Sequence, residues 1–168
     1  NFSERQPGNG WGRFRNPAGG DVAVISLLGK VFMKDSAYNP FDTVEQILKQ
    51  IPVTCKCVVV DFHAEATGEK KALGYYAAGR VSAVFGTHTH VQTADEQILE
   101  GGTAYITDVG MCGAQDSVLG ATPEMAIMRF TSSVRKGYEG ATAGRAVCAV
   151  FLETDEKGRA IRIERITT

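Results

Sequence analysis

The sequence has 168 residues, enough for one domain with a buried core, and it is 43% hydrophobic and 22% charged. This composition excludes a disordered chain. The formal net charge of −1 argues against a dedicated nucleic-acid surface and against membrane attachment, because both usually require a basic excess.

Glycine and proline interrupt the opening of the chain, so we expect an irregular segment over residues 1–20. Residues 22–32 are β-branched and apolar and predict a buried strand. Asn39 can cap a helix, and Pro40 suits a first helical position. Apolar residues at helical spacing then predict a helix over residues 41–51.

A strand, a helix and a second strand follow in the middle of the chain. Residues 57–62 form a near-continuous apolar run, which is typical of a central strand covered on both faces. Residues 68–79 predict a helix that ends at a glycine cap, and residues 81–85 predict the next strand. Such a βαβ unit should contain parallel strands joined by a right-handed crossover.

The carboxyl-terminal part of the chain predicts hairpins and turns. We expect a hairpin of residues 97–99 and 103–107, a long loop over residues 108–120, a short helix over residues 123–130 and a terminal antiparallel hairpin of residues 145–153 and 160–166. The predicted fold class is mixed α/β, in a single domain over residues 1–168.

The three histidines of the chain follow the two strands of the βαβ unit. His63 comes directly after residues 57–62, and His88 and His90 come soon after residues 81–85. The carboxyl ends of parallel strands meet at one edge of a sheet, where ligands of open α/β sheets bind. Neighbouring strands lie about 4.8 Å apart, so we expect the three imidazoles to converge on one small volume.

Neutral imidazole is the commonest nitrogen ligand for zinc, iron and related ions. Because side chains alternate along an extended segment, His88 and His90 should point to the same side of their loop. The carboxylates of Asp61, Glu65 and Asp95 could act behind the histidines by fixing their tautomers. A single histidine in a loop is more often plain polar surface, and that alternative stays open.

Four sequence blocks, at residues 61–67, 86–95, 107–111 and 116–120, contain DFHAEAT, GTHTHVQTAD, TDVGM and DSVLG. With these blocks the sequence resembles the YmdB-like family of metallophosphoesterases over nearly its whole length. The first two blocks are long and specific, far more so than an isolated H-x-H pair.

The resemblance implies that the chain forms part of an α/β/β/α metallophosphoesterase sandwich. It implies hydrolysis of a cyclic nucleotide or a related phosphodiester at two divalent metal ions, with iron or manganese as the metals. In that arrangement His63 and His88 would bind one ion, and His90 would bind the other.

The same resemblance implies that part of the site lies elsewhere. The family's GDxxG aspartate, its GEN glutamate–asparagine pair and its GNH histidine, the usual proton donor, do not occur in this sequence. We therefore expect the chain to be the carboxyl-terminal part of the enzyme, to hold at most one ion and to show no turnover by itself. Its expected partners are the missing amino-terminal half or another chain, as in a homo-oligomer, and a small phosphodiester substrate.

Further positions are expected to face the substrate or to support the metal ligands. They are Asp61, Glu65, Thr89, Asp95, Asp108, Asp116 and Ser117. Residues 108–120 are rich in glycine, which lets a backbone approach a substrate closely, but a plain connecting loop is the alternative. The resemblance favours a wall beside the substrate. No residue is assigned as the catalytic acid. Two alternatives stay open: an inactive binding or regulatory fragment, and a mononuclear metal hydrolase that is complete as it stands.

The four cysteines show no zinc-knuckle spacing, so we expect packed, reduced thiols. Neither a signal peptide nor a segment of transmembrane length is visible in the sequence. We therefore expect a cytoplasmic protein.

Overall fold

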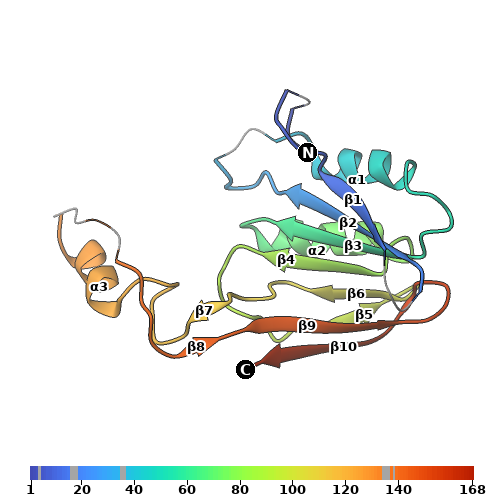
Figure 1. Ribbon diagram of the computed structural model, residues 1–168. Coiled ribbons are helices and arrows are strands. Elements are labelled where there is room, and N and C mark those ends of the chain that lie inside the picture. Colours follow the sequence, from blue (N-terminus) through green and yellow to red (C-terminus); the bar gives the residue numbers. More distant parts are fainter. Residues whose placement is uncertain (4, 16–18, 35–36, 134–136, 138) are drawn as a thin grey trace.

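The computed structural model describes residues 1–3, 5–15, 19–34, 37–133, 137 and 139–168 (Figure 1). Its strands are β1 (Trp11–Arg15), β2 (Asp21–Leu28), β3 (Cys57–His63), β4 (Ala83–Thr87), β5 (Gln97–Leu99), β6 (Thr103–Ile106), β7 (Gly113–Ala114), β8 (Arg145–Ala146), β9 (Cys148–Thr154) and β10 (Ala160–Thr167). Its helices are α1 (Pro40–Leu48), α2 (Thr67–Ala77) and α3 (Pro123–Thr131). The predicted mixed α/β class is confirmed.

A six-stranded sheet in the order β1-β2-β3-β4-β6-β5 forms the centre of the fold. Strands β2, β3, β4 and β6 run parallel, and the two edge strands run antiparallel to their neighbours. The predicted βαβ unit is confirmed, because β3 and β4 pair in parallel and α2 connects them. The β5–β6 hairpin and the terminal β9–β10 hairpin are confirmed as well.

Helix α1 begins where the sequence predicted. The Oδ1 atom of Asn39 accepts a hydrogen bond from the N–H of Phe41 at 3.0 Å, and Pro40 occupies the first turn. Val44 and Ile47 face the sheet and join the main core. Because so short a helix is marginal in isolation, this apolar packing supplies most of its stability.

Helices α1 and α2 cover one face of the sheet, and the β9–β10 hairpin packs against the other face (Figure 1). The core on the helix side includes Val60 and Phe62 of β3. On the opposite face, Ala83 and Ala104 of the sheet pack with Ala160 of the hairpin. Within the described residues this gives three layers, α/β/β, which fit part of the predicted α/β/β/α sandwich.

The opening segment is more regular than predicted. Trp11–Arg15 forms β1 antiparallel to β2, so the prediction of an irregular segment over residues 1–20 was wrong for these residues. The reason is tertiary, because the outer edge of β2 offers backbone N–H and C=O groups that another strand can satisfy. Residues 4 and 16–18 of that segment lie outside the described residues.

The strand predicted over residues 22–32 ends earlier, at Leu28. Beyond it, the N–H groups of Lys30 and Val31 donate hydrogen bonds to the carboxylate of Glu69, at 2.9 and 3.2 Å. A side chain from the first turn of α2 thus replaces a neighbouring strand as the backbone partner. Sequence pattern cannot show this exchange, because the donors and the acceptor are far apart in the chain.

Three smaller expectations also change. The loop predicted over residues 108–120 contains β7, which pairs with β8 and so splits the strand predicted over residues 145–153. Helix α2 ends at Ala77, two residues earlier than predicted, and the predicted capping glycine, Gly79, follows the C-cap residue Ala78 with a φ of 75°. Cys112 is exposed, although a packed thiol was predicted. Among the helices that the structure describes, none has the length and apolar character needed to cross a membrane.

Candidate functional site

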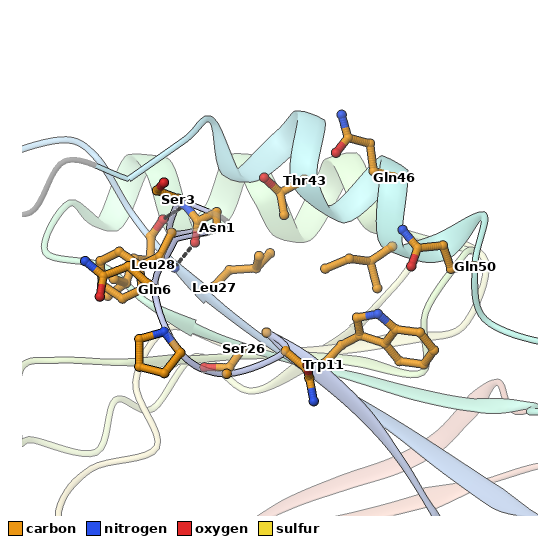
Figure 2. A pocket seen from close by; sticks show the side chains of 16 residues that line it. Asn1, Ser3, Gln6, Trp11, Ser26, Leu27, Leu28, Thr43, Gln46 and Gln50 are labelled. Atoms are coloured by element: carbon orange, nitrogen blue, oxygen red, sulfur yellow. Dashed lines mark hydrogen bonds between the residues drawn. The ribbon is translucent and has the colours of Figure 1, made fainter.

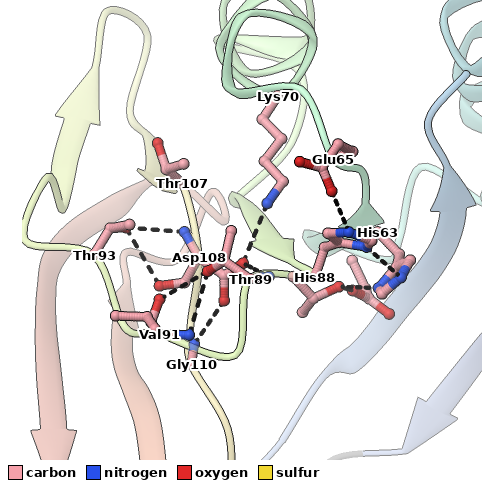
Figure 3. A network of polar contacts seen from close by, with 12 residues as sticks. His63, Glu65, Lys70, His88, Thr89, Val91, Thr93, Thr107, Asp108 and Gly110 are labelled. Atoms are coloured by element: carbon pink, nitrogen blue, oxygen red, sulfur yellow. Dashed lines mark hydrogen bonds and ion pairs between the residues drawn. The ribbon is translucent and has the colours of Figure 1, made fainter. Parts of the chain in front are cut away.

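Two of the three histidines meet at the carboxyl ends of neighbouring parallel strands (Figure 3). His63 is the last residue of β3, and its Cα partner across the sheet is Thr87, the last residue of β4. His88 follows directly. Its Nδ1 atom lies 3.1 Å from Nε2 of His63, and the two rings meet edge to face with their centroids 4.9 Å apart.

The hydroxyl of Thr87 and the carboxylate of Asp61 form a hydrogen-bonded chain that ends at the ring of His63. Its Nδ1 atom lies 3.0 Å from Oγ1 of Thr87, and that hydroxyl donates to Oδ1 of Asp61 at 3.3 Å. Since the one hydroxyl proton goes to the carboxylate, Thr87 accepts from the Nδ1–H of His63, and the lone pair of His63 is on Nε2. Burial lowers the pKa of His63, and the neighbouring His88 lowers it further, so the neutral form is favoured.

The ring of His88 is oriented by a carboxylate on its other side. Its Nε2 atom contacts Oε2 of Glu65. When this carboxylate accepts from Nε2–H, the lone pair of His88 is on Nδ1 and faces the lone pair of His63. Such an arrangement needs a cation between the rings. A proton on His88 is one such cation, and a metal ion is the other.

The two imidazoles fit as ligands of one metal ion. Two nitrogen ligands that each lie about 2.0–2.1 Å from an ion are about 3 Å apart at ordinary bond angles, and His63 and His88 show this separation. Glu65 does not complete the set, because it contacts the opposite nitrogen of the His88 ring. No three His, Cys, Asp or Glu side chains of the described residues form a ready metal cluster. An ion held here would need further donors.

His90 lies two residues further along the loop, and its side chain is exposed. The prediction that this loop is extended, with alternating side chains, was wrong, because φ is 131° at His88 and 64° at His90. Positive φ costs a non-glycine residue about 1–3 kcal/mol, so such residues persist only where the surroundings hold them.

Asp108 holds the histidine loop (residues 88–96, between β4 and β5) from inside the protein. Its Oδ2 atom accepts from the N–H of Thr89 at 2.8 Å and from Nζ of Lys70 at 3.2 Å, and its Oδ1 atom accepts from the N–H of Gly110 at 2.9 Å (Figure 3). The side chains of Lys70 and Asp108 are 1% and 0% exposed. Asp108 therefore supports the histidine loop and does not line a solvent-facing wall.

Asp95 fastens the far end of the same loop. Its Oδ1 atom accepts from Oγ1 of Thr93 at 2.6 Å and from the N–H of Thr107 at 3.1 Å, and its Oδ2 atom accepts from Oγ1 of Thr107 at 2.5 Å. Burial by itself raises the pKa of Asp95, but these hydrogen bonds outweigh that effect and hold the pKa below its ordinary value.

The other predicted positions serve local turns or face solvent. The Thr89 hydroxyl donates within its own turn. The Ser117 hydroxyl donates to the carbonyl of Ala114 at 2.5 Å and accepts from the N–H of Gly120 at 2.9 Å, so it stabilises a turn. Asp116 is exposed.

The sequence and the fold both match known proteins. The model of the YmdB-like protein family matches residues 1–166. This chain belongs to the YmdB-like family.

Relatives of this YmdB-like chain are longer than the chain itself. It is 42% identical to the 2′,3′-cyclic-nucleotide 2′-phosphodiesterase of Bacillus subtilis (strain 168) over 167 residues, which are 99% of this chain and 62% of that protein. A crystal structure of a hypothetical protein from Thermus thermophilus matches with a TM-score of 0.92 at 36% identity, covering 100% of this chain and 65% of the other. A crystal structure of a phosphatase from Mycoplasma pneumoniae matches with a TM-score of 0.87 at 37% identity, covering 99% and 59%.

Sequence reasoning missed two residues that organise the YmdB-like site. Thr87 links His63 to Asp61, but a threonine at a strand end carries no special signal. Lys70 was detectable, because it begins an i, i+3, i+4, i+7 stripe whose other members, Leu73, Gly74 and Ala77, are buried. A lysine on the buried stripe of a helix predicts a buried partner.

A separate pocket of about 530 Å³ in the YmdB-like chain lies between the opening segment, β2 and α1 (Figure 2). Asn1 spans one end of it, donating to the carbonyl of Leu28 and accepting from the N–H of Leu28, both at 2.7 Å. Among the residues that line it, no side chain is acidic, basic or a thiol. The histidine cluster, which brings two imidazoles together, is therefore the better candidate for a site that performs chemistry.

Proposed function

We propose that this chain supplies the His63, His88 and His90 portion of a two-metal centre in a phosphodiesterase. The observation that carries the proposal is the 3.1 Å approach of His63 Nε2 to His88 Nδ1 at one sheet edge, with the opposite nitrogen of each ring already paired. The name of the Bacillus subtilis relative points to a 2′,3′-cyclic nucleotide as the substrate class.

Residues of this chain would orient the histidine ligands and keep each ring in the tautomer whose lone pair can bind a metal ion. Thr87 and Asp61 keep the lone pair of His63 on Nε2, and Glu65 keeps that of His88 on Nδ1. His90 is exposed, and we propose it as a ligand of the second ion. Bound divalent cations, iron or manganese in this proposal, would supply charge neutralisation and an activated water.

The proposal includes donors from outside these 168 residues. Three histidines provide no bridging carboxylate, and two adjacent cations need one. We propose that the remaining donors and the proton-donating group come from a segment that the longer relatives contain or from another chain. The homo-oligomer and the cytoplasmic location stay predictions.

The test compares two proteins with manganese. One is the 168-residue chain, and the other is this chain joined to the part of the Bacillus subtilis relative that lies outside the match. We expect the joined protein to hydrolyse a 2′,3′-cyclic nucleotide and bis-p-nitrophenyl phosphate, and the chain by itself to stay at background. His88→Ala or His90→Ala should lower turnover of the joined protein by about 100-fold or more. Glu100→Gln, an exposed change in the β5–β6 turn, is the matched control.

Two results would overturn this proposal. A folded joined protein without turnover would refute the phosphodiesterase assignment. Robust hydrolysis by the 168-residue chain, lost on His90→Ala, would instead assign a complete mononuclear hydrolase.

A further inference from the structure

A buried ion pair lies beneath the loop that carries His88 and His90. Lys70, in the first turn of α2, and Asp108, just after β6, form this pair at 3.2 Å with side chains 1% and 0% exposed. Replacing such a pair by apolar residues of similar volume is often neutral or stabilising. Stability is therefore a weak explanation for it.

The contacts of Asp108 point to a different role. The carboxylate accepts the N–H of Thr89, which stands between the two positive-φ residues His88 and His90. The backbone of Asp108 bonds the same loop again, because its N–H donates to Oγ1 of Thr93 at 2.9 Å and its carbonyl accepts from the N–H of Thr93 at 3.1 Å. Asp108 thus forms hydrogen bonds with the histidine loop at two residues, Thr89 and Thr93.

Lys70 fixes the position of the Asp108 carboxylate. Its stem passes Gly86 of β4, since a Cβ at residue 86 would come 3.1 Å from Cδ of Lys70. Its Nζ atom donates to the same Oδ2 atom that accepts from Thr89. The lysine therefore ties the carboxylate to α2, the helix that also connects β3, with its terminal His63, to β4.

We infer that Lys70 and Asp108 are positioning residues, which keep His88 and His90 in their strained backbone conformation and thereby set the placement of their imidazoles. The consequence for metal binding rests on the proposed function. The consequence for the conformation of the histidine loop does not rest on it, so an experiment can refute either consequence without the other.

The experiment compares the 168-residue chain with two double variants. Together they distinguish a loss of folding from a loss of loop positioning. Lys70→Met with Asp108→Leu removes both charges and leaves no acceptor for the Thr89 N–H. Lys70→Met with Asp108→Asn also removes both charges but keeps one carbonyl oxygen as an acceptor. Arg80→Met is the control, because it breaks the Arg80–Glu45 ion pair just beyond the other end of α2.

Three quantities are measured on each protein: the melting temperature, the exchange rate of the Thr89 amide by NMR, and the affinity for Mn²⁺. In the Met/Leu variant we expect a folded protein in which Thr89 exchanges about 10-fold faster or more, with Mn²⁺ affinity about 10- to 100-fold weaker. The Met/Asn variant should fall between it and the native chain. Arg80→Met should leave the Thr89 exchange rate and the Mn²⁺ affinity unchanged.

Native exchange of Thr89 in a folded Met/Leu variant would overturn the inference. If that variant does not fold, the Met/Asn variant decides, and Thr89 exchange equal to the native rate would overturn the inference there. If neither the native chain nor the joined protein binds Mn²⁺, the proposed metal centre fails, while the Thr89 exchange rates still decide the positioning role.

Discussion

The carbonyl oxygen of Thr107 lies directly against Gly86, so close that a Cβ built at residue 86 would sit 1.8 Å from it. The carbonyl of Gly86 in turn accepts a hydrogen bond from the N–H of Val109 at 2.9 Å. The end of β4 and the segment after β6 therefore touch backbone to backbone at the base of the histidine loop. Only glycine permits this approach.

Gly86→Ala should destabilise the 168-residue chain by about 3 kcal/mol or more, because backbone must move to admit the methyl group. Gly68→Ala is the matched control, since a Cβ there has open space and the residue lies in α2. It should change stability by less than about 1 kcal/mol, in the stabilising direction. Urea unfolding of the two variants measures both effects. Equal stability of the two would contradict the close approach.

Asp95→Asn should lower the free energy of unfolding at neutral pH by about 1–3 kcal/mol, because the carboxylate accepts three hydrogen bonds. The folded pKa of Asp95 is depressed, so its contribution is present above the unfolded pKa and is lost as pH falls through the folded value. The native chain should therefore lose more stability on acidification than the variant does. Urea unfolding between pH 7 and pH 3 measures the difference. Parallel pH profiles of the two proteins would refute this role.

Tyr105→Phe should flatten the loss of stability at alkaline pH. Tyr105 is 1% exposed, and burial raises its pKa from 10.0 to about 12. Its contribution is complete below pH 10 and is lost as pH rises towards 12, because in that window only the unfolded state releases the proton. Tyr75→Phe, at a side chain 62% exposed, is the control. Urea unfolding at pH 9 to 11.5 checks this, and a native-like alkaline slope in the Tyr105→Phe protein would disprove it.

Elemental analysis after dialysis should find at most one Mn²⁺ or Fe²⁺ per 168-residue chain, held weakly, since the chain brings two imidazoles together and no complete cluster among its described residues. His63→Ala or His88→Ala should remove this ion. Chelation should leave the fold intact, because the main hydrophobic core does not include His63 or His88. Two tightly held ions per chain would show that the ligand count is mistaken.

Local patterns in the sequence were sufficient for several parts of this protein. The Asn39–Pro40 helix start, the βαβ unit and the two hairpins depend on caps, turns and apolar spacing within short stretches of chain. The placement of His63 and His88 at one sheet edge followed from that topology, because parallel neighbouring strands end on the same side.

Only the tertiary structure decided how that edge is built. Lys70 and Asp108 meet although they are 38 residues apart in the sequence, and Thr87 reaches His63 across a separation of 24. Tertiary contacts also determine the added strand β1, the early end of β2 and the positive φ of His88 and His90. Each arises because a buried or strained backbone group takes whichever partner the packed fold places beside it. Local sequence specifies elements, but it does not specify which distant side chain comes to lie against them.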